Sequence, residues 1–202
     1  MHKNVITISR GYGSGGTEIG RMIADEMKIP FYDKELIEIA AKESGYALDF
    51  IEENGEYAKN SLLFHIAMNG AFGANIYSKD NMSVVDKIYI IQSKIIKDIA
   101  EKGPCVIIGR CADYILRSRD DCLNLFIYSN DFEFKKDILS KSASENFSIT
   151  EKEIAKKDKS RASHYKHYTG REWGAVSNYH ASFDSSFLGL ERTKDIIISM
   201  LK

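Results

Sequence analysis

The chain lacks the features that mark several large classes of protein. Lysine and arginine number 28 against 29 aspartate and glutamate residues, so the formal net charge of −1 gives no general attraction to nucleic acid or to a membrane surface. No apolar run is long enough to cross a bilayer. The chain enters a strand-like run at once, which leaves no room for a signal peptide. We therefore expect a cytoplasmic protein that binds neither nucleic acid nor membrane.

Cysteine is scarce, and the common nucleophile motifs are missing. Cys105, Cys111 and Cys122 are odd in number, lie in apolar surroundings and form no close pair of the metal-binding type, so we expect core thiols in a reducing compartment. No Gly-x-Ser-x-Gly elbow is present. His164 and His167 have helical i, i+3 spacing but lack a third ligand, so no metal site is expected.

A glycine-rich turn follows the first apolar run and organises the chain. The β-branched run at 5–10 predicts a buried strand, and the pattern through residue 27 predicts an amphipathic helix. Strand, glycine loop and helix together place backbone N–H groups around a bound phosphate, and glycine allows a close approach. An ordinary flexible turn is the alternative. The predicted phosphate-binding residues are Gly11, Tyr12, Gly13, Ser14, Gly15, Gly16 and Thr17.

The loop lacks the lysine of the usual pattern G-x-x-x-x-G-K-[ST]. Gly11 and Gly16 have the correct spacing, but Thr17 stands at the lysine position and Glu18 at the position of the metal-binding hydroxyl. Backbone N–H groups can still hold phosphate, with the hydroxyl of Ser14 or Thr17 beside them. The missing positive charge must then come from another part of the chain.

Strand-like and helix-like segments alternate, which predicts an α/β fold with a parallel sheet flanked by helices. The length of 202 residues and the 44% hydrophobic content suit one domain. Ligands of such sheets bind outside the carboxyl ends of the strands, where Arg10, Asp33 and Arg110 fall. The expected strands cover 5–10, 31–33, 105–108, 122–128 and 179–183. The expected helices include 48–53, 62–68, 84–100, 114–116, 131–141, 150–171 and 190–201.

Arg110 follows the apolar run at 105–108 and a glycine, so it emerges at a strand end. A guanidinium group there suits bidentate binding of phosphate or carboxylate, and a structural ion pair is an equally good interpretation. Asp113 lies one helical turn further on.

The cluster at 156–161 carries the strongest local positive charge. It is either a solvated helix face or a mobile segment that brings cations over a transferring phosphoryl group. Lys157 and Arg161 lie four apart and share a helix face, so both could point at one ligand. The aromatic side chains that follow could stack on a base, but we favour packing against the sheet for Tyr165, Tyr168, Trp173 and Tyr179.

Six segments in order resemble the bacterial cytidylate kinase-like family, which belongs to the P-loop nucleoside monophosphate kinases. They are ITISRGYGSGGTEIGRMIADEM, IPFYDKELI, VIIGRCADYIL, LFIYS, KKDKSRASHYKHYTG and YHASFDSSFLGLE. The resemblance implies a P-loop NTPase-type parallel sheet in a single domain, 1–202. Within it, a helical insertion at 34–102 would bind the nucleoside monophosphate, and 145–178 would form a lid.

The same resemblance implies a role for each matching residue. Gly11 to Thr17 would hold the phosphates of ATP, with Mg²⁺ bound mainly through those phosphates. Charge on the transferring group would be neutralised by Arg110, Lys157 and Arg161. The acceptor would be bound by Asp33, Arg110, Asp113, Asp158 and Arg161, with Asp184 near the adenine-side wall.

The expected function is ATP-dependent phosphoryl transfer to CMP or dCMP. Three departures from the family pattern keep alternatives open. The loop lysine is absent, and Thr17 also replaces a basic residue of many relatives that have this GSGG loop. The lid has lysine at 157 and 159 where the true enzymes are richer in arginine. The alternatives are a nucleotide-binding protein with little or no kinase activity and a kinase for another small substrate. A homo-oligomer is also compatible with the sequence.

Overall fold

The computed structural model describes residues 4–33, 84–141 and 148–201, together with Leu36, Glu38, Ile39 and Lys42. The helices expected at 48–53 and 62–68 lie outside the described residues, as does most of the insertion expected at 34–102.

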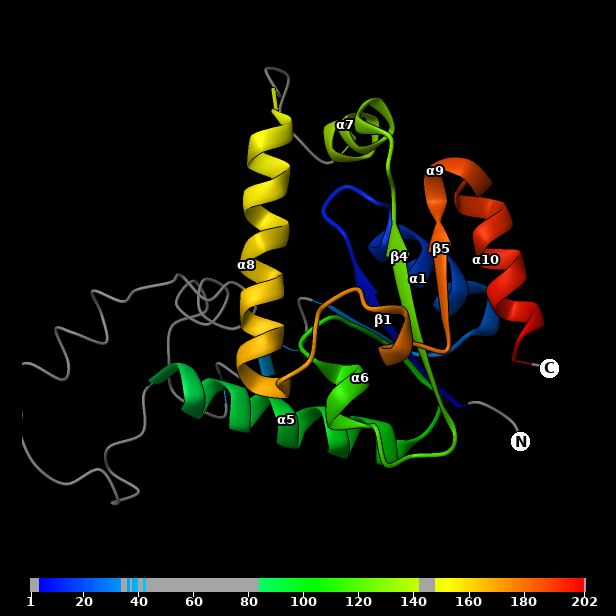
Figure 1. Ribbon diagram of the computed structural model, residues 1–202. Coiled ribbons are helices and arrows are strands. Elements are labelled where there is room, and N and C mark those ends of the chain that lie inside the picture. The colour runs from blue at the N-terminus through cyan, green and yellow to red at the C-terminus, as the bar shows by residue number, and fades with distance from the viewer. Residues whose placement is uncertain are drawn as a thin grey trace, which may run out of the picture.

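Five strands form one parallel sheet, as the alternation of segments predicted (Figure 1). Every neighbouring pair is parallel, and the order is β2-β3-β1-β4-β5. The central strands are buried, which explains their nearly continuous apolar sequences. The strands are β1 (Val5–Arg10), β2 (Phe31–Tyr32), β3 (Cys105–Ile108), β4 (Cys122–Tyr128) and β5 (Ala181–Asp184).

The helices lie close to their expected ranges, with one addition. The short α9 was not expected, since its four residues show no periodicity and Gly189, at φ 80°, separates it from α10. The final strand also begins two residues later than expected, at Ala181. The helices are α1 (Gly16–Met27), α5 (Val84–Lys102), α6 (Ala112–Ile115), α7 (Phe132–Ser140), α8 (Glu151–Thr169), α9 (Ser185–Leu188) and α10 (Leu190–Ser199), with a 3₁₀ turn at Val176–Asn178.

Helices cover both faces of the sheet. Residues of α1 and α10 pack with Ile6 and Ile8 of β1, whereas residues of α5 and α6 pack with Val5 on the other face. The helix after β1 and the helix after β3 therefore lie on opposite faces, although β1 and β3 are neighbours. In open α/β sheets this arrangement opens a crevice at the carboxyl ends of the two strands, where ligands bind.

Helix α8 extends from the level of α7 to α5 (Figure 1). A capping box starts it, in which the Thr150 side chain accepts from the Glu153 N–H and the Glu153 side chain accepts from the Thr150 N–H. Gly170, at φ 70°, ends it. The helix is largely polar, and the residues that it buries are Ile154, Arg161, His164, Tyr165 and Thr169.

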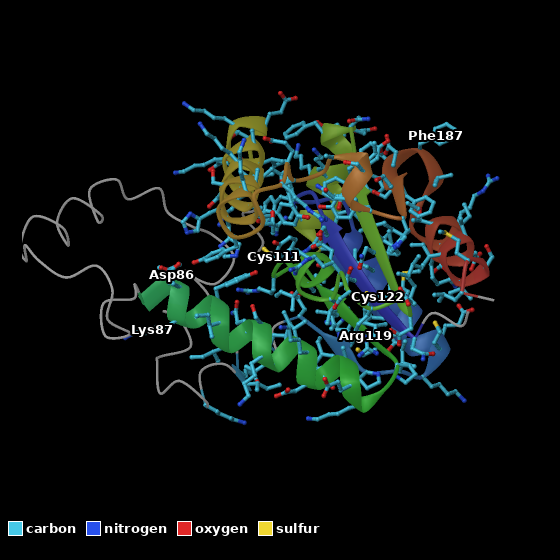
Figure 2. All side chains as sticks on the ribbon, turned by 60° about the horizontal axis from the view of Figure 1, so that its bottom comes forward. Asp86, Lys87, Cys111, Arg119, Cys122 and Phe187 are labelled. Atoms are coloured by element: carbon cyan, nitrogen blue, oxygen red, sulfur yellow. The ribbon has the colours of Figure 1, made fainter. Side chains whose placement is uncertain are left out.

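The three cysteines are buried and form no disulfide, as expected for core thiols. Burial raises the pKa of the Cys105 thiol to about 11, so it is protonated and unreactive near neutral pH. Cys111 and Cys122 lie within the molecule, whereas Phe187, 86% exposed, projects outward from α9 (Figure 2). No helix in the described ranges is both long enough and apolar enough to span a membrane.

Candidate functional site

The glycine loop between β1 and α1 is tightly built. Gly11 donates its N–H to the Ile127 carbonyl at 2.9 Å, and Ser14 donates its N–H to the Gly11 carbonyl at 3.2 Å. Gly13 and Gly15 have φ values of 74° and 72°, a region in which a Cβ is strained. The loop geometry therefore requires glycine at these positions.

Ser185 fixes the loop to the rest of the sheet. Its fully buried hydroxyl lies 2.5 Å from the Ser14 carbonyl and 2.9 Å from the Tyr128 carbonyl, and its single hydrogen can be donated to one of them at a time. The sequence analysis did not identify Ser185 as a site residue. Its position directly after the last strand, beside Asp184, was the available signal.

Three arginines from three different elements converge beside the loop. Arg10 ends β1, Arg110 follows β3 and Arg161 lies in α8, and they are only 8%, 5% and 7% exposed. All three line one small cavity together with Ser9, Gly109, Cys111, His164, Tyr165 and Trp173. Three buried guanidinium groups line this cavity, and carboxylates lie beside two of them, at 3.7 Å for Arg10 with Asp33 and 3.8 Å for Arg161 with Asp158. The guanidinium groups are suited to binding an anion.

The turn that carries Arg110 is strained. Gly109, Arg110 and Cys111 all adopt left-handed backbone conformations, with φ values of 65°, 57° and 56°. Such a conformation costs a non-glycine residue roughly 1–2 kcal/mol. Strain of this kind is typical of functional sites, where the surrounding structure holds a side chain in a required position. Here it brings the buried Arg110 into the lining of the cavity.

Helix α8 contacts the glycine loop directly. The backbone N–H of Tyr12 donates to Asp158 Oδ1 at 2.7 Å, and Arg161 Nη1 donates to the Arg10 carbonyl at 3.1 Å. Arg161 also lies 3.8 Å from Asp158 Oδ1 and 5.5 Å from the centre of the Tyr12 ring. Burial raises the pKa of Asp158, although the Tyr12 N–H and Arg161 act in the opposite direction.

A buried hydrogen bond attaches the other half of α8 to α6. The Tyr165 hydroxyl donates to Asp113 Oδ2 at 2.6 Å. Burial raises the pKa of the Asp113 carboxyl group, and burial together with the nearby Asp113 charge raises the pKa of Tyr165. Asp113, which was expected at the substrate, thus takes part in a contact between α6 and α8 that joins residues 52 positions apart in the sequence.

The remaining candidates are spread around the crevice. Asp33 Oδ1 forms an ion pair with Arg10 Nη2 at 3.7 Å. Asp184 caps α9: its carboxylate accepts from the backbone N–H of Ser186 at 3.0 Å and from Asn130 Nδ2 at 3.2 Å. Lys157 is exposed and, unlike Arg161, lines neither the cavity formed by the three arginines (the arginine cavity) nor a second cavity, which lies over the glycine loop.

The cavity over the loop is a separate pocket of about 100 Å³. It is bordered by residues 11–18, Ile138 and Leu139, and it shares Arg10 and Arg161 with the arginine cavity. Because ligand pockets usually measure roughly 300–1,000 Å³, this one suits a phosphate group better than a whole nucleotide. Arg10 was placed at a strand end by the sequence but was not identified as a site residue. A charged residue at the end of a buried strand was the signal.

The aromatic side chains pack, as expected. Trp173 meets Phe126 edge-on at 5.2 Å, and Tyr168 stacks on Tyr89 at 3.9 Å. His164 is buried with its ring 4.8 Å from that of Tyr168. No group of three potential metal-binding side chains occurs among the described residues.

Comparison with known proteins agrees with this architecture. A family model described as the cytidylate kinase-like family matches residues 5–187. An uncharacterized protein from Eubacterium ventriosum is 24% identical, with a TM-score of 0.68, over 98% of this chain and 97% of that chain. The shikimate kinase from Bacteroides thetaiotaomicron is 14% identical, with a TM-score of 0.54, over 98% and 97% of the two chains. The shikimate kinase from Acinetobacter baumannii is 11% identical, with a TM-score of 0.52, over 98% and 92%. No curated protein gives a significant match. The fold is therefore that of the P-loop kinases.

Proposed function

The chain belongs to the cytidylate kinase-like family, and from that premise we propose that it transfers the γ-phosphoryl group of ATP to the phosphate of CMP or dCMP. One observation carries the proposal. Arg10, Arg110 and Arg161 come from different elements and meet, buried, beside the glycine loop at the crevice of the sheet. Phosphoryl transfer requires this kind of clustered positive charge, because charge is distributed over the transferring oxygens in the transition state.

The reaction requires little covalent chemistry from the protein. An oxygen of the acceptor phosphate forms a bond to the γ-phosphorus while the bond to the bridging oxygen of ATP breaks, and the electron pair of that bond leaves with ADP. The products are ADP and CDP or dCDP. No general base is required, since the acceptor phosphate is already anionic. The protein contributes position and charge stabilisation.

Each part of the site has a role in this proposal. The amides of residues 11–17 hold the donor phosphates, Arg110 binds the acceptor phosphate, and Arg161 neutralises charge between them. The segment 145–178, which contains α8, acts as the lid, and Lys157 joins the site only if that segment moves. Asp33, Asp113 and Asp158 contribute to the acceptor side and Asp184 to the adenine side. The insertion at 34–102 completes the acceptor site.

Mg²⁺ would be held mainly through the nucleotide phosphates. Thr17 and Glu18 line the cavity over the loop, and their side chains carry hard oxygen ligands of the kind that fits the cation. Bound Mg²⁺ supplies charge neutralisation on the phosphate oxygens.

A second candidate function is nucleotide binding with little or no turnover. The observation that favours it is Thr17, a neutral residue at the position of the loop lysine. A kinase for another small substrate is the third candidate, since much of the insertion that would select the acceptor lies outside the described residues.

A coupled ADP-release assay tests the proposal. The acceptors are CMP, dCMP, UMP, AMP, GMP and, as an acceptor without phosphate, shikimate. We expect turnover with CMP or dCMP and none with shikimate, and we expect Arg110→Gln to raise the KM for the acceptor. Turnover with shikimate alone would favour the third candidate. If calorimetry detects ATP binding but turnover appears only in Thr17→Lys, the second candidate is correct.

A further inference from the structure

We propose that Arg10 takes the place of the missing loop lysine and stabilises the transferring phosphoryl group, an inference that depends on the function proposed above. The geometry that points to it is the course of the Arg10 side chain. It begins at the end of β1, passes against the first residue of α1 and extends over the end of β3 to Asp33.

The first part of this course is given by the contacts of Gly16. A Cβ at Gly16 would lie 2.6 Å from Arg10 Cβ and 3.2 Å from Arg10 Cγ. The stem of Arg10 therefore lies directly against the residue that precedes Thr17. This contact explains why glycine is needed at position 16, whose helical backbone does not itself demand glycine.

The second part of the course is given by the ion pair with Asp33. Arg10 Nη2 lies 3.7 Å from Asp33 Oδ1, at the end of β2. Strand β3 lies between β1 and β2, so the side chain extends across the carboxyl end of β3. The guanidinium group consequently lies between the glycine loop and the turn that carries Arg110.

This location is common to both cavities. Arg10 lines the cavity over the loop, where donor phosphates would bind, and the arginine cavity, whose volume of about 20 Å³ must widen before it admits the acceptor phosphate. The transferring group must pass between these two positions. Arg161 lines both cavities as well, but it lies on α8, which is held by side-chain contacts with the end of β1, the glycine loop, α5 and α6 instead of by strand pairing.

Arg10 has the rigidity that a fixed catalytic charge requires. It belongs to β1, which pairs with β3 on one side and with β4 on the other. Only 8% of the residue is exposed, and its partner Asp33 orients it from the far side of β3. An arginine keeps its charge at any physiological pH, and its planar fork can contact two phosphate oxygens at once. The charge of the absent ammonium group is therefore supplied from the residue before the loop.

A charge-relocation experiment tests this assignment. The variants are Arg10→Gln, Arg10→Lys, Thr17→Lys and the double variant Arg10→Gln/Thr17→Lys. Arg119→Gln is the matched control, because Arg119 pairs with Asp121 instead of lining either cavity. Measured quantities are kcat and KM for ATP and CMP, the ATP affinity by calorimetry and the melting temperature.

We expect Arg10→Gln to lower kcat about 10²-fold or more, the loss typical of one removed transition-state donor. Arg10→Lys should retain part of the activity. Adding Thr17→Lys to Arg10→Gln should raise kcat at least about tenfold, because the new lysine returns a cation to the same phosphates. Adding Thr17→Lys to wild type should change kcat much less. Arg119→Gln should leave kcat and the KM values for ATP and CMP unchanged.

The failures can be distinguished. If wild type binds ATP and turns over, but Arg10→Gln does so equally well, the role of Arg10 is wrong and the proposed function stands. If Arg10→Gln melts far below wild type, Arg10→Gln and Arg10→Gln/Thr17→Lys are compared at a temperature at which both are folded: equal kcat in the two contradicts the role of Arg10, because they share the substitution at position 10 and differ only in the returned cation. If wild type binds ATP without turnover, a loss of ATP affinity in Arg10→Gln that Thr17→Lys restores supports the assignment, and unchanged affinity contradicts it. If wild type binds no nucleotide, both proposals fail.

Discussion

The backbone N–H of Tyr12, in the glycine loop, donates to the Asp158 carboxylate of α8 across 2.7 Å and 146 positions of sequence. A negative charge thus lies against the loop that we propose to bind phosphate. Burial raises the pKa of this carboxyl group, so the folded protein favours its neutral form more than the unfolded chain does. The contact holds α8 close to the loop and places a like charge beside any anion bound there.

Asp158→Asn tests the electrostatic part of this contact. The amide oxygen can still accept from the Tyr12 N–H, whereas the negative charge is removed. We expect the affinity for inorganic tripolyphosphate, measured by calorimetry, to rise at least about fivefold, since two charges 4 Å apart in water interact with about 1 kcal/mol. Unchanged affinity would mean that Asp158 lies too far from the bound anion to matter.

The same variant has a predictable dependence on pH. The folded-state pKa of Asp158 lies above its ordinary value of 3.8, so protonation favours folding. Ionised Asp158 therefore costs stability above the raised pKa, and the cost disappears as the pH falls toward the unfolded-state value. Asp158→Asn does not titrate, so its melting temperature relative to wild type should rise as the pH increases from about 4 toward 7. A difference that stays constant over this range would contradict the assignment.

Tyr165→Phe removes the hydroxyl that donates to Asp113 at 2.6 Å. Leaving a buried carboxylate oxygen without this bond should lower the free energy of unfolding by about 1–3 kcal/mol, measured in urea. The bond acts to lower the Asp113 pKa, so it favours the carboxylate, and the loss should be larger at pH 7 than at pH 4. Tyr168→Phe is the control: its partner Asp86 is half-buried, and the loss should stay below about 1 kcal/mol.

Arg110→Gly and Arg110→Ala separate strain from function. Both variants remove the guanidinium group, but only glycine adopts the φ of 57° without strain. Arg110→Gly should therefore be about 1–2 kcal/mol more stable than Arg110→Ala. Both should lose acceptor turnover. Equal stabilities would show that the turn relaxes when the arginine is removed.

Gly16→Ala should disturb the site through Arg10. A new Cβ would lie 2.6 Å from Arg10 Cβ and 3.1 Å from Ile127 Cβ, atoms that cannot move without the strands. We expect a loss of about 1–3 kcal/mol in the free energy of unfolding, although alanine ordinarily favours a helix. Gly170→Ala is the comparison, since its Cβ would meet no atom within 4 Å and its cost comes from the φ of 70° alone. Gly16→Ala should also weaken ATP binding, whereas Gly170→Ala should leave it unchanged.

The strands and long helices follow from local patterns in the sequence. The apolar run at 105–108 became β3, because a strand that is buried on both faces of a sheet contains mostly apolar residues. The periodic run from Val84 became α5, because a helix that is buried along one stripe has apolar residues at helical spacing. The short α9 was missed, since four residues show no period. The late start of β5 reflects Tyr179, which is buried against Phe126 instead of pairing in the sheet.

The sequence by itself determined the strand–glycine loop–helix unit, the parallel sheet and the family, because these depend on neighbouring residues and their spacing. Only the tertiary structure decided which charges meet. It buries Arg161 and leaves Lys157 exposed on the same helix, bonds Asp113 to Tyr165, and directs Arg10 past Gly16 toward Asp33. The ion pair of Arg10 with Asp33 and the hydrogen bonds of Tyr165 and Arg161 join residues from about 20 to 150 positions apart. They depend on how the helices cross the end of the sheet, which no local pattern in the chain records.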